Sequence, residues 1–214
     1  MYGKRSYGGI APLQPRHEDD FYPTPIGLCT AAVELLPTFV AGGSLFFLDP
    51  GCGSGVWGQA IRRSKFGKLF LNPIIVGVEL RDIEYNPDYT LLHSNFNYLT
   101  DHLTDNNFDY VIGNPPYKLA EQFVRKAHSD LLNGGYLLFL LRLGFLAGQD
   151  RSAHLFQEMP PTDVWICGKR PSFYLPDHPK HKKTDAQDYA LYLWKKGVKE
   201  TTKLHFDFRW DYDR

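Results

Sequence analysis

Short, continuous runs of apolar residues alternate with amphipathic segments along most of the chain. The continuous runs predict strands that are buried on both faces of a sheet, because a half-exposed strand would alternate apolar and polar residues. The strands predicted around such runs span residues 44–49, 73–80, 89–95, 108–114, 136–145, 162–168 and 188–196. A later segment, residues 203–210, does alternate with period two and predicts an edge strand.

The segments between the runs carry apolar residues at helical spacing. They predict helices within residues 24–40, 56–65, 119–132 and 149–159, and the third is expected to be closed by Asn133, Gly134 and Gly135. Strands interleaved with helices indicate a doubly wound, mostly parallel α/β sandwich. Residues 1–20, rich in Gly, Pro and charge, predict a flexible N-terminal arm, and residues 21–214 then form a single domain.

Composition excludes some classes of protein. The 214 residues carry 24 Lys and Arg against 24 Asp and Glu, so the total charge indicates no attraction to nucleic acid or to a membrane. Cys29, Cys52 and Cys167 are far apart and form no metal-binding pattern, which favours a reduced, cytoplasmic compartment and no metal site. No apolar stretch is long enough to cross a membrane, and the first residues lack the apolar run of a signal peptide.

A glycine-rich turn follows the first predicted strand, in the sequence "DPGCGSG" of residues 49–55. Such a turn lets backbone amides approach a ligand closely. Gly53, Gly55 and Gly58 with Glu79 also satisfy the dinucleotide-binding pattern, but weakly. Asp49 would repel a pyrophosphate and suits an amine-bearing nucleoside instead. The alternative interpretation is that the glycines only allow the following helix to pack closely and bind no ligand.

A rigid elbow follows the fourth predicted strand, in "NPPY" of residues 114–117. The two prolines end the strand and hold Asn114 in an extended conformation. Asn114 offers an amide that donates and accepts, the Pro115 and Pro116 carbonyls accept, and Tyr117 adds a flat aromatic face. Together they can hold a planar amine or amide, although a proline-rich connecting turn is the commoner interpretation of such a segment alone.

The glycine turn, Glu79 and the elbow, in this order on alternating strands, resemble the S-adenosylmethionine-dependent amino-methyltransferases, especially the small DNA adenine-N6 enzymes of phages and mobile elements. The resemblance covers roughly residues 21 to 195. It implies a seven-stranded Rossmann-like sandwich whose last strand is antiparallel, and S-adenosyl-L-methionine as cofactor. The family commonly attaches a separate recognition domain; its absence here implies short, relaxed or partner-supplied specificity.

The resemblance also implies which residues hold the cofactor. Its methionine end is expected on the segment "FYPTP", its ribose on Glu79, and its adenine near "HSNFN", where Asn95 stands in place of the family's Asp. The family's helix between the second and third strands is missing, so a loop with Ile83 or Tyr85 is expected over the adenine. The full expected set is Tyr22, Thr24, Pro25, Asp49, Pro50, Gly51, Cys52, Gly53, Glu79, Asn95, Phe96 and Asn114.

Transfer is then expected by in-line displacement on the adenine N6. The Asn114 side-chain oxygen and the Pro115 carbonyl each accept one N–H and aim the nitrogen lone pair at the methyl carbon, with Pro116 completing the elbow. Tyr117 stacks on the base, which in duplex DNA must be flipped out of the helix. No cysteine has the setting that a C5-cytosine enzyme needs, and N4-cytosine enzymes usually carry Ser or Asp at the position of Asn114.

A basic and aromatic loop, residues 168–187, is the candidate DNA-binding element, with a solvated loop as the alternative. Phe173 is expected to form a second aromatic wall beside the target base. The expected phosphate contacts are Lys118, Lys169, Arg170, Lys180, Lys182 and Lys183. Two alternative substrates stay open, an RNA adenine and a protein glutamine amide. A nucleoside-binding module without catalysis is the alternative to an enzyme.

Overall fold

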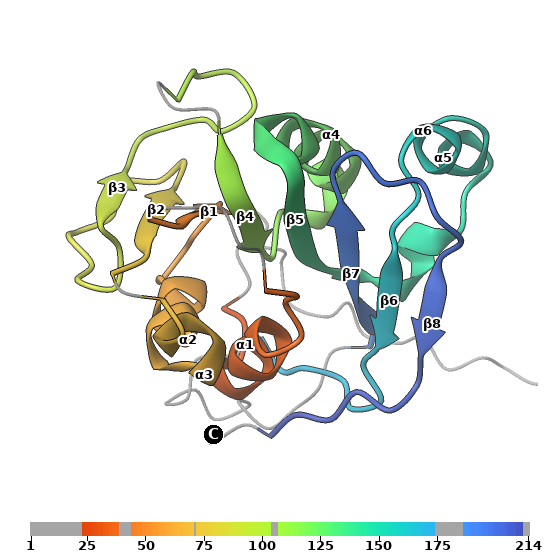
Figure 1. The fold of residues 1–214 in the computed structure, drawn as a ribbon, viewed down its shortest axis with the longest axis horizontal. Coiled ribbons are helices and arrows are strands. Elements are labelled where there is room, and N and C mark those ends of the chain that lie inside the picture. The colour runs from red at the N-terminus through yellow and green to blue at the C-terminus, as the bar shows by residue number, and fades with distance from the viewer. Residues whose placement is uncertain (1–22, 39–43, 71, 104–106, 174–185, 212–214) are drawn as a thin grey trace, which may run out of the picture.

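A computed structural model describes residues 23–38, 44–70, 72–103, 107–173 and 186–211. In this part of the chain the strands form an eight-stranded sheet in the order β3-β2-β1-β4-β5-β7-β6-β8, seen from left to right in Figure 1. The strands are β1 (Phe46–Pro50), β2 (Ile74–Val78), β3 (Leu91–His93), β4 (Phe108–Gly113), β5 (Leu131–Arg142), β6 (Asp163–Ile166), β7 (Tyr189–Lys195) and β8 (Lys203–His205). The doubly wound α/β class predicted from the apolar runs is confirmed.

Most neighbouring strands are parallel, and β7 is the exception. It pairs antiparallel with β5, Leu138 opposite Leu193, and antiparallel with β6, Val164 opposite Tyr192. An antiparallel seventh strand was expected from the family resemblance. The segment predicted as an edge strand supplies β8, which pairs in parallel with β6 and closes that edge of the sheet.

Helices cover both faces of the sheet. They are α1 (Ile26–Val33), α2 (Val56–Arg63), α3 (Lys65–Lys68), α4 (Ala120–Asp130), α5 (Gln149–Ala153) and α6 (Leu155–Glu158), with short 3-10 turns η1 (Tyr117–Leu119) and η2 (Leu143–Leu146). In Figure 1, α1 to α3 group on one side of the sheet and α4 to α6 on the other. Each group packs on its own buried apolar layer, so the sheet lies between two cores, as its continuous apolar strands require.

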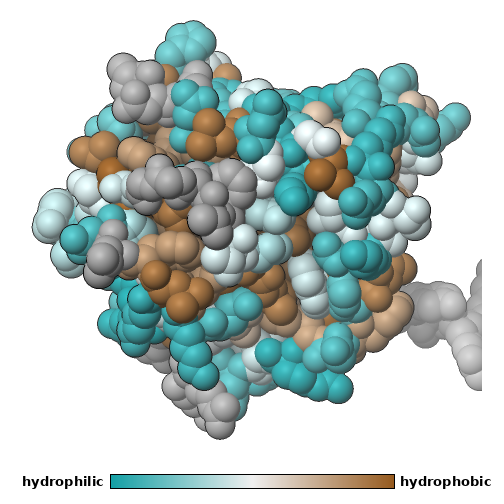
Figure 2. Space-filling model, viewed as in Figure 1, coloured by the Kyte–Doolittle hydropathy of each residue, from teal (hydrophilic) through white to brown (hydrophobic). Residues whose placement is uncertain are grey.

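The alternation of residues along each strand divides these two cores. On β1, Phe47 faces the α1 to α3 side, where its ring stacks on Tyr110 of β4 at 4.8 Å between centroids. Leu48, the next residue, belongs to the layer under α4. On the outer face shown in Figure 2, hydrophilic and hydrophobic residues are interspersed. No helix in the described ranges is long and apolar enough to cross a membrane.

The prediction for the third helix was wrong at its C-terminal end. The helix ends at Asp130, and Leu131 already pairs with Phe108 as the first residue of β5. Asp130 is buried and its Oδ2 accepts a hydrogen bond from the Tyr98 hydroxyl at 2.7 Å. Gly135 lies within β5, at a point where the backbone passes close to β4. A Cβ here would stand 2.9 Å from the Asp109 carbonyl oxygen, so this position of the strand requires glycine.

The expected absence of a helix between the second and third strands is confirmed. Residues 79–90 form no helix between β2 and β3. Tyr89 instead fills the space that faces the start of α2, and its ring lies where a Cβ on Gly58 or Gly77 would clash at 2.8 Å. The N-terminal arm, residues 1–20, lies outside the described residues.

Candidate active site

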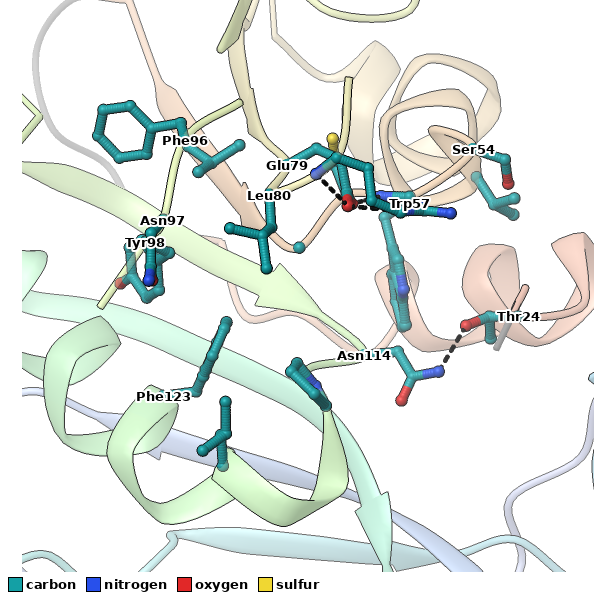
Figure 3. Close-up of a pocket in the computed structure, with 18 of the residues that line it drawn as sticks. Thr24, Ser54, Trp57, Glu79, Leu80, Phe96, Asn97, Tyr98, Asn114 and Phe123 are labelled. Atoms are coloured by element: carbon teal, nitrogen blue, oxygen red, sulfur yellow. Dashed lines mark hydrogen bonds and ion pairs between the residues drawn. The ribbon is translucent and has the colours of Figure 1, made fainter. Parts of the chain in front are cut away.

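A pocket opens at the carboxyl ends of β1, β2 and β4, where the glycine turn, the end of β2 and the elbow meet. Carboxyl ends of parallel strands are where open α/β sheets bind ligands. Figure 3 shows Phe96, Asn97 and Tyr98 at one end of this pocket and Thr24 and Asn114 at the other, with Glu79 and Leu80 between. Segments far apart in sequence therefore contribute to one elongated site.

The glycine turn is held against the end of β2 by its backbone. The amides of Gly51 and Cys52 both donate to the Val78 carbonyl, at 2.7 Å and 2.9 Å. The Gly53 amide donates to Glu79 Oε2 at 2.8 Å (Figure 3). Gly51 and Gly53 have positive φ angles of 76° and 55°, which glycine adopts without strain. Gly51, Cys52 and Gly53 all line the pocket.

Glu79 is almost wholly buried and its carboxylate is largely engaged. Its Oε1 accepts from the Arg81 backbone amide at 3.1 Å and from Arg81 Nε at 2.8 Å, while Oε2 accepts from Gly53. A carboxylate offers about four acceptor positions. One position on Oε2 therefore remains for a ligand hydroxyl, and a second hydroxyl would have to displace Arg81.

Asp49 lies behind the glycine turn and does not line the pocket. Its side chain is wholly buried, and its Oδ2 accepts a hydrogen bond of 2.6 Å from the Tyr89 hydroxyl. Burial raises the pKa of Asp49 to about 7, although the Tyr89 hydrogen bond acts in the opposite direction. The structure thus places Asp49 beside the turn but outside the pocket lining, and its contact with the cofactor amine stays a prediction. Pro50, which ends β1, likewise does not line the pocket.

The segment before α1 supplies one end wall. Pro23 and Thr24 line the pocket, and the Thr24 hydroxyl oxygen accepts a hydrogen bond of 3.1 Å from Asn114 Nδ2 (Figure 3). Pro25 does not line it, because its carbonyl accepts the amides of Leu28 and Cys29 at the start of α1. Tyr22 lies outside the described residues.

At the opposite end, Phe96 lines the pocket as expected, but Asn95 does not. Asn95 adopts a positive φ of 54°, and its backbone amide donates to the Arg81 carbonyl at 3.2 Å. The polar side chain that lines this end is Asn97. Tyr85, expected over the adenine, is 82% exposed, and Ile83 packs on the core under α1 to α3. Leu80 and Arg81 line the pocket instead.

The elbow is divided between this pocket and an aromatic cluster. Asn114 and Pro116 line the pocket, whereas Pro115 and Tyr117 do not. The Tyr117 ring lies 5.5 Å from Tyr189 and 6.4 Å from Phe173, between ring centroids. Burial raises the pKa of its hydroxyl well above the ordinary value.

Arg142, the last residue of β5, lies over the Tyr117 ring with its guanidinium carbon 4.8 Å from the centroid. Arg142 was not predicted from the sequence, because it ends an apolar strand and no local pattern marks it. Arg142 covers one face of the Tyr117 ring, so the base-stacking role expected for Tyr117 requires either the other face or displacement of Arg142.

Two of the candidate phosphate contacts that the structure describes, Lys169 and Arg170, are engaged with acidic or aromatic groups. Lys169 Nζ lies 3.7 Å from Asp211 and 4.9 Å from the Trp210 ring centroid. Arg170 Nε lies 2.7 Å from Asp188. Lys118 is exposed at the elbow. Lys180, Lys182 and Lys183 lie outside the described residues.

The three cysteines are free and buried. Burial raises the pKa of Cys167 to about 12, and burial with the nearby carboxylates raises that of Cys52 further. A thiolate nucleophile is thereby disfavoured at both positions. Within the described ranges, no three His, Cys, Asp or Glu side chains come together as a metal site would require.

Sequence comparison finds no matching family model and no matching curated protein. Solved structures do match. The chain aligns over 90% of its length with 67% of a protein from Listeria monocytogenes that carries the provisional name of a class I S-adenosylmethionine-dependent methyltransferase, at 17% identity and a TM-score of 0.63.

Two further matches are subunits of restriction-modification systems. The methyltransferase subunit of a type I system from Streptococcus thermophilus is 17% identical, with 83% of this chain and 45% of that chain covered and a TM-score of 0.58. The M protein of the type I restriction enzyme EcoKI is 15% identical, with 83% and 44% covered and a TM-score of 0.57. The chain thus spans less than half the length of these two subunits. At these identities the matches establish the architecture: the chain has the Rossmann-like methyltransferase fold.

Proposed function

We propose that this protein is an S-adenosyl-L-methionine-dependent methyltransferase that acts on the exocyclic N6 amine of adenine in DNA. The observation that carries the proposal is that one pocket brings together the glycine turn, Glu79 and Asn114. The glycine turn and Glu79 can each bind a different portion of the cofactor. Asn114 can bind a planar amine that lies beside the cofactor. The DNA methyltransferase subunits among the structural matches support DNA as the substrate.

The residues that line the pocket follow the same order as the adenine, ribose and amino-acid portions of S-adenosylmethionine. Phe96 offers a ring face and Asn97 an amide at one end, where an adenine would lie. Glu79 keeps one acceptor position on Oε2 for a ribose hydroxyl. Thr24 offers a hydroxyl beside Asn114 at the other end. When bound, the cofactor supplies a methyl group on a positively charged sulfur, which a neutral nitrogen can attack.

The elbow orients the attacking amine. The Pro116 carbonyl already accepts the Leu119 amide at 2.9 Å, so the Pro115 carbonyl is assigned as the backbone acceptor for the substrate. In Figure 3 the carboxamide oxygen of Asn114 points away from Thr24. These two oxygens accept hydrogen bonds from the two N–H groups of the adenine amine. They thereby direct the nitrogen lone pair at the methyl carbon of the cofactor. No base needs to remove a proton first, because the methylated ammonium loses its proton readily.

Phe173 and Tyr117 are assigned to the target base. Their rings form an edge contact at 6.4 Å between centroids, with an interplanar angle of 61°. Base–aromatic stacking contributes about 1 to 3 kcal/mol per base, which offsets much of the cost of flipping a base out of a duplex. The segment of residues 174–185, with its lysines, is assigned to the DNA backbone.

The test is an incubation of the protein with methyl-labelled S-adenosylmethionine and, separately, with DNA, RNA and a glutamine-containing protein. Mass spectrometry of the digested product identifies the modified group. We expect N6-methyladenine in DNA, and no transfer by an Asn114→Ala variant that still binds the cofactor. Transfer to RNA or to a glutamine amide would replace the substrate assignment. Binding of the cofactor with no transfer to any of them would favour a nucleoside-binding module.

A further inference from the structure

Trp57 lies at the point where the glycine turn becomes α2, as the second residue of that helix. It lines the pocket while remaining only 3% exposed. Figure 3 shows its indole extending from the turn toward Asn114 and Thr24, at the end of the pocket opposite Phe96. No role was predicted for Trp57 from the sequence, because a tryptophan on the apolar face of a helix is normally a core residue.

The indole nitrogen of Trp57 is a buried donor without an acceptor among the residues that the structure describes. Two other indoles have acceptors: Trp194 Nε1 donates to the Met159 carbonyl at 3.1 Å, and Trp210 Nε1 donates to the Lys169 carbonyl at 3.3 Å. A buried N–H without a partner is unfavourable, so a donor left in this state at a ligand pocket indicates that the ligand supplies the acceptor.

The start of α2 independently favours a negative charge at the same place. Its N-cap residue is Gly55, which has no side chain to cap the helix, and its first turn carries no acidic residue. The Gly58 amide of this turn donates to the Tyr89 hydroxyl at 3.3 Å, which leaves the amides of Val56 and Trp57 for a ligand. The N-terminus of a helix has a partial positive charge and N–H groups that point outward. Val56 and Trp57, its first two residues, both line the pocket.

We propose that the Trp57 Nε1–H, together with the backbone amides of Val56 and Trp57 at the N-terminus of α2, binds the carboxylate of the cofactor's amino-acid end. This inference rests on the proposed function. The amino-acid end carries an ammonium and a carboxylate, and only the carboxylate accepts hydrogen bonds. An indole N–H is a donor only, so it selects the carboxylate and leaves the ammonium to other groups. Neighbouring atoms cover the indole nitrogen of Trp57, so these atoms must move when the carboxylate binds.

The test compares two ligands that differ by this one group. Isothermal titration calorimetry measures the dissociation constants of S-adenosylmethionine and of decarboxylated S-adenosylmethionine for the native protein and for Trp57→Phe, which keeps an aromatic ring but removes the N–H. We expect Trp57→Phe to bind S-adenosylmethionine about tenfold more weakly, and to bind the decarboxylated ligand as the native protein does.

Trp194→Phe is the matched control, since it removes an indole N–H that is bonded to Met159 on the other side of the sheet. Both substitutions remove ring volume from a buried position, so each should lower the melting temperature. Trp194→Phe should nevertheless leave both dissociation constants unchanged. Equal affinities of Trp57→Phe and the native protein for S-adenosylmethionine would refute the inference, as would an equal loss for both ligands. Failure of the native protein to bind either ligand would instead refute the proposed function itself.

Discussion

The side-chain amide of Asn114 donates a hydrogen bond of 3.1 Å to the hydroxyl oxygen of Thr24, a residue 90 positions earlier in the sequence. This contact joins the elbow after β4 to the segment before α1 across one end of the pocket (Figure 3). It fixes which way the carboxamide faces, because the nitrogen is turned toward Thr24. The oxygen is turned away from Thr24, the direction in which the proposed function places the substrate amine.

Thr24→Val tests this orientation, since valine has nearly the same shape and lacks the hydroxyl. We expect kcat for methyl transfer to fall by about tenfold or more, because a misaligned acceptor loses the near-attack geometry. Steady-state kinetics on adenine-containing DNA measures the effect. Thr24→Ser keeps the hydroxyl and should retain most of the activity. An unchanged kcat in Thr24→Val would show that the contact does not position Asn114 for transfer.

Tyr89→Phe removes the hydroxyl that donates to Asp49 at 2.6 Å. We expect a loss of about 1.5 to 3 kcal/mol in the free energy of unfolding, the range for a hydrogen bond to a charged group. Urea denaturation at about pH 8 measures it. Tyr192→Phe is the control, since its hydroxyl donates to the neutral carbonyl of Arg142 and should cost less. Equal stability of Tyr89→Phe and the native protein would contradict a stabilising role of this hydrogen bond.

The raised pKa of Asp49 predicts a pH dependence of stability. Its pKa is about 7 in the folded protein, against an ordinary value of 3.8. Between these values the folded protein holds a proton that the unfolded chain releases, so the free energy of unfolding should fall as pH rises from about 4 to about 7. Asp49→Asn cannot titrate, so its stability relative to the native protein should increase over this window. Urea denaturation of both at several pH values measures the difference, and a pH-independent difference would contradict the shift.

Replacing Lys180, Lys182 and Lys183 together by Gln tests the DNA-binding segment. If each contacts a phosphate, DNA affinity should fall and the slope of log affinity against log salt should become shallower by about 3. Fluorescence anisotropy at several salt concentrations measures the slope. The control replaces three exposed lysines elsewhere, Lys65, Lys68 and Lys199. A slope unchanged in the first variant would remove this segment from the interface.

The fold followed from the sequence because its signals are local. The run of residues 136–145 is apolar except for Arg142, and the central part of β5 is indeed buried from Tyr136 to Leu141. The end of α4 could not be read in the same way. Leu131 and Leu132 suit a helix as well as a strand, and only the pairing of Leu131 with Phe108 and the contact of Tyr98 with Asp130 decide between them.

The candidate site was also predictable from the sequence where its signals are local, and not where they depend on the fold. Glu79 and the glycines were found because their positions after strands are visible in sequence. Asn95 was expected at the pocket, but its left-handed backbone presents Asn97 there instead. Trp57 and Arg142 were missed because their neighbours, Thr24 and Tyr117, come from other segments that only the folded sheet brings together.

The most direct test of the account is a crystal structure of the protein with S-adenosylhomocysteine, the product of the proposed transfer. The account predicts the ribose on Glu79, the glycine turn beneath the amino-acid end and the sulfur facing the side chain of Asn114. A ligand bound elsewhere, or one whose sulfur faces away from Asn114, would contradict it.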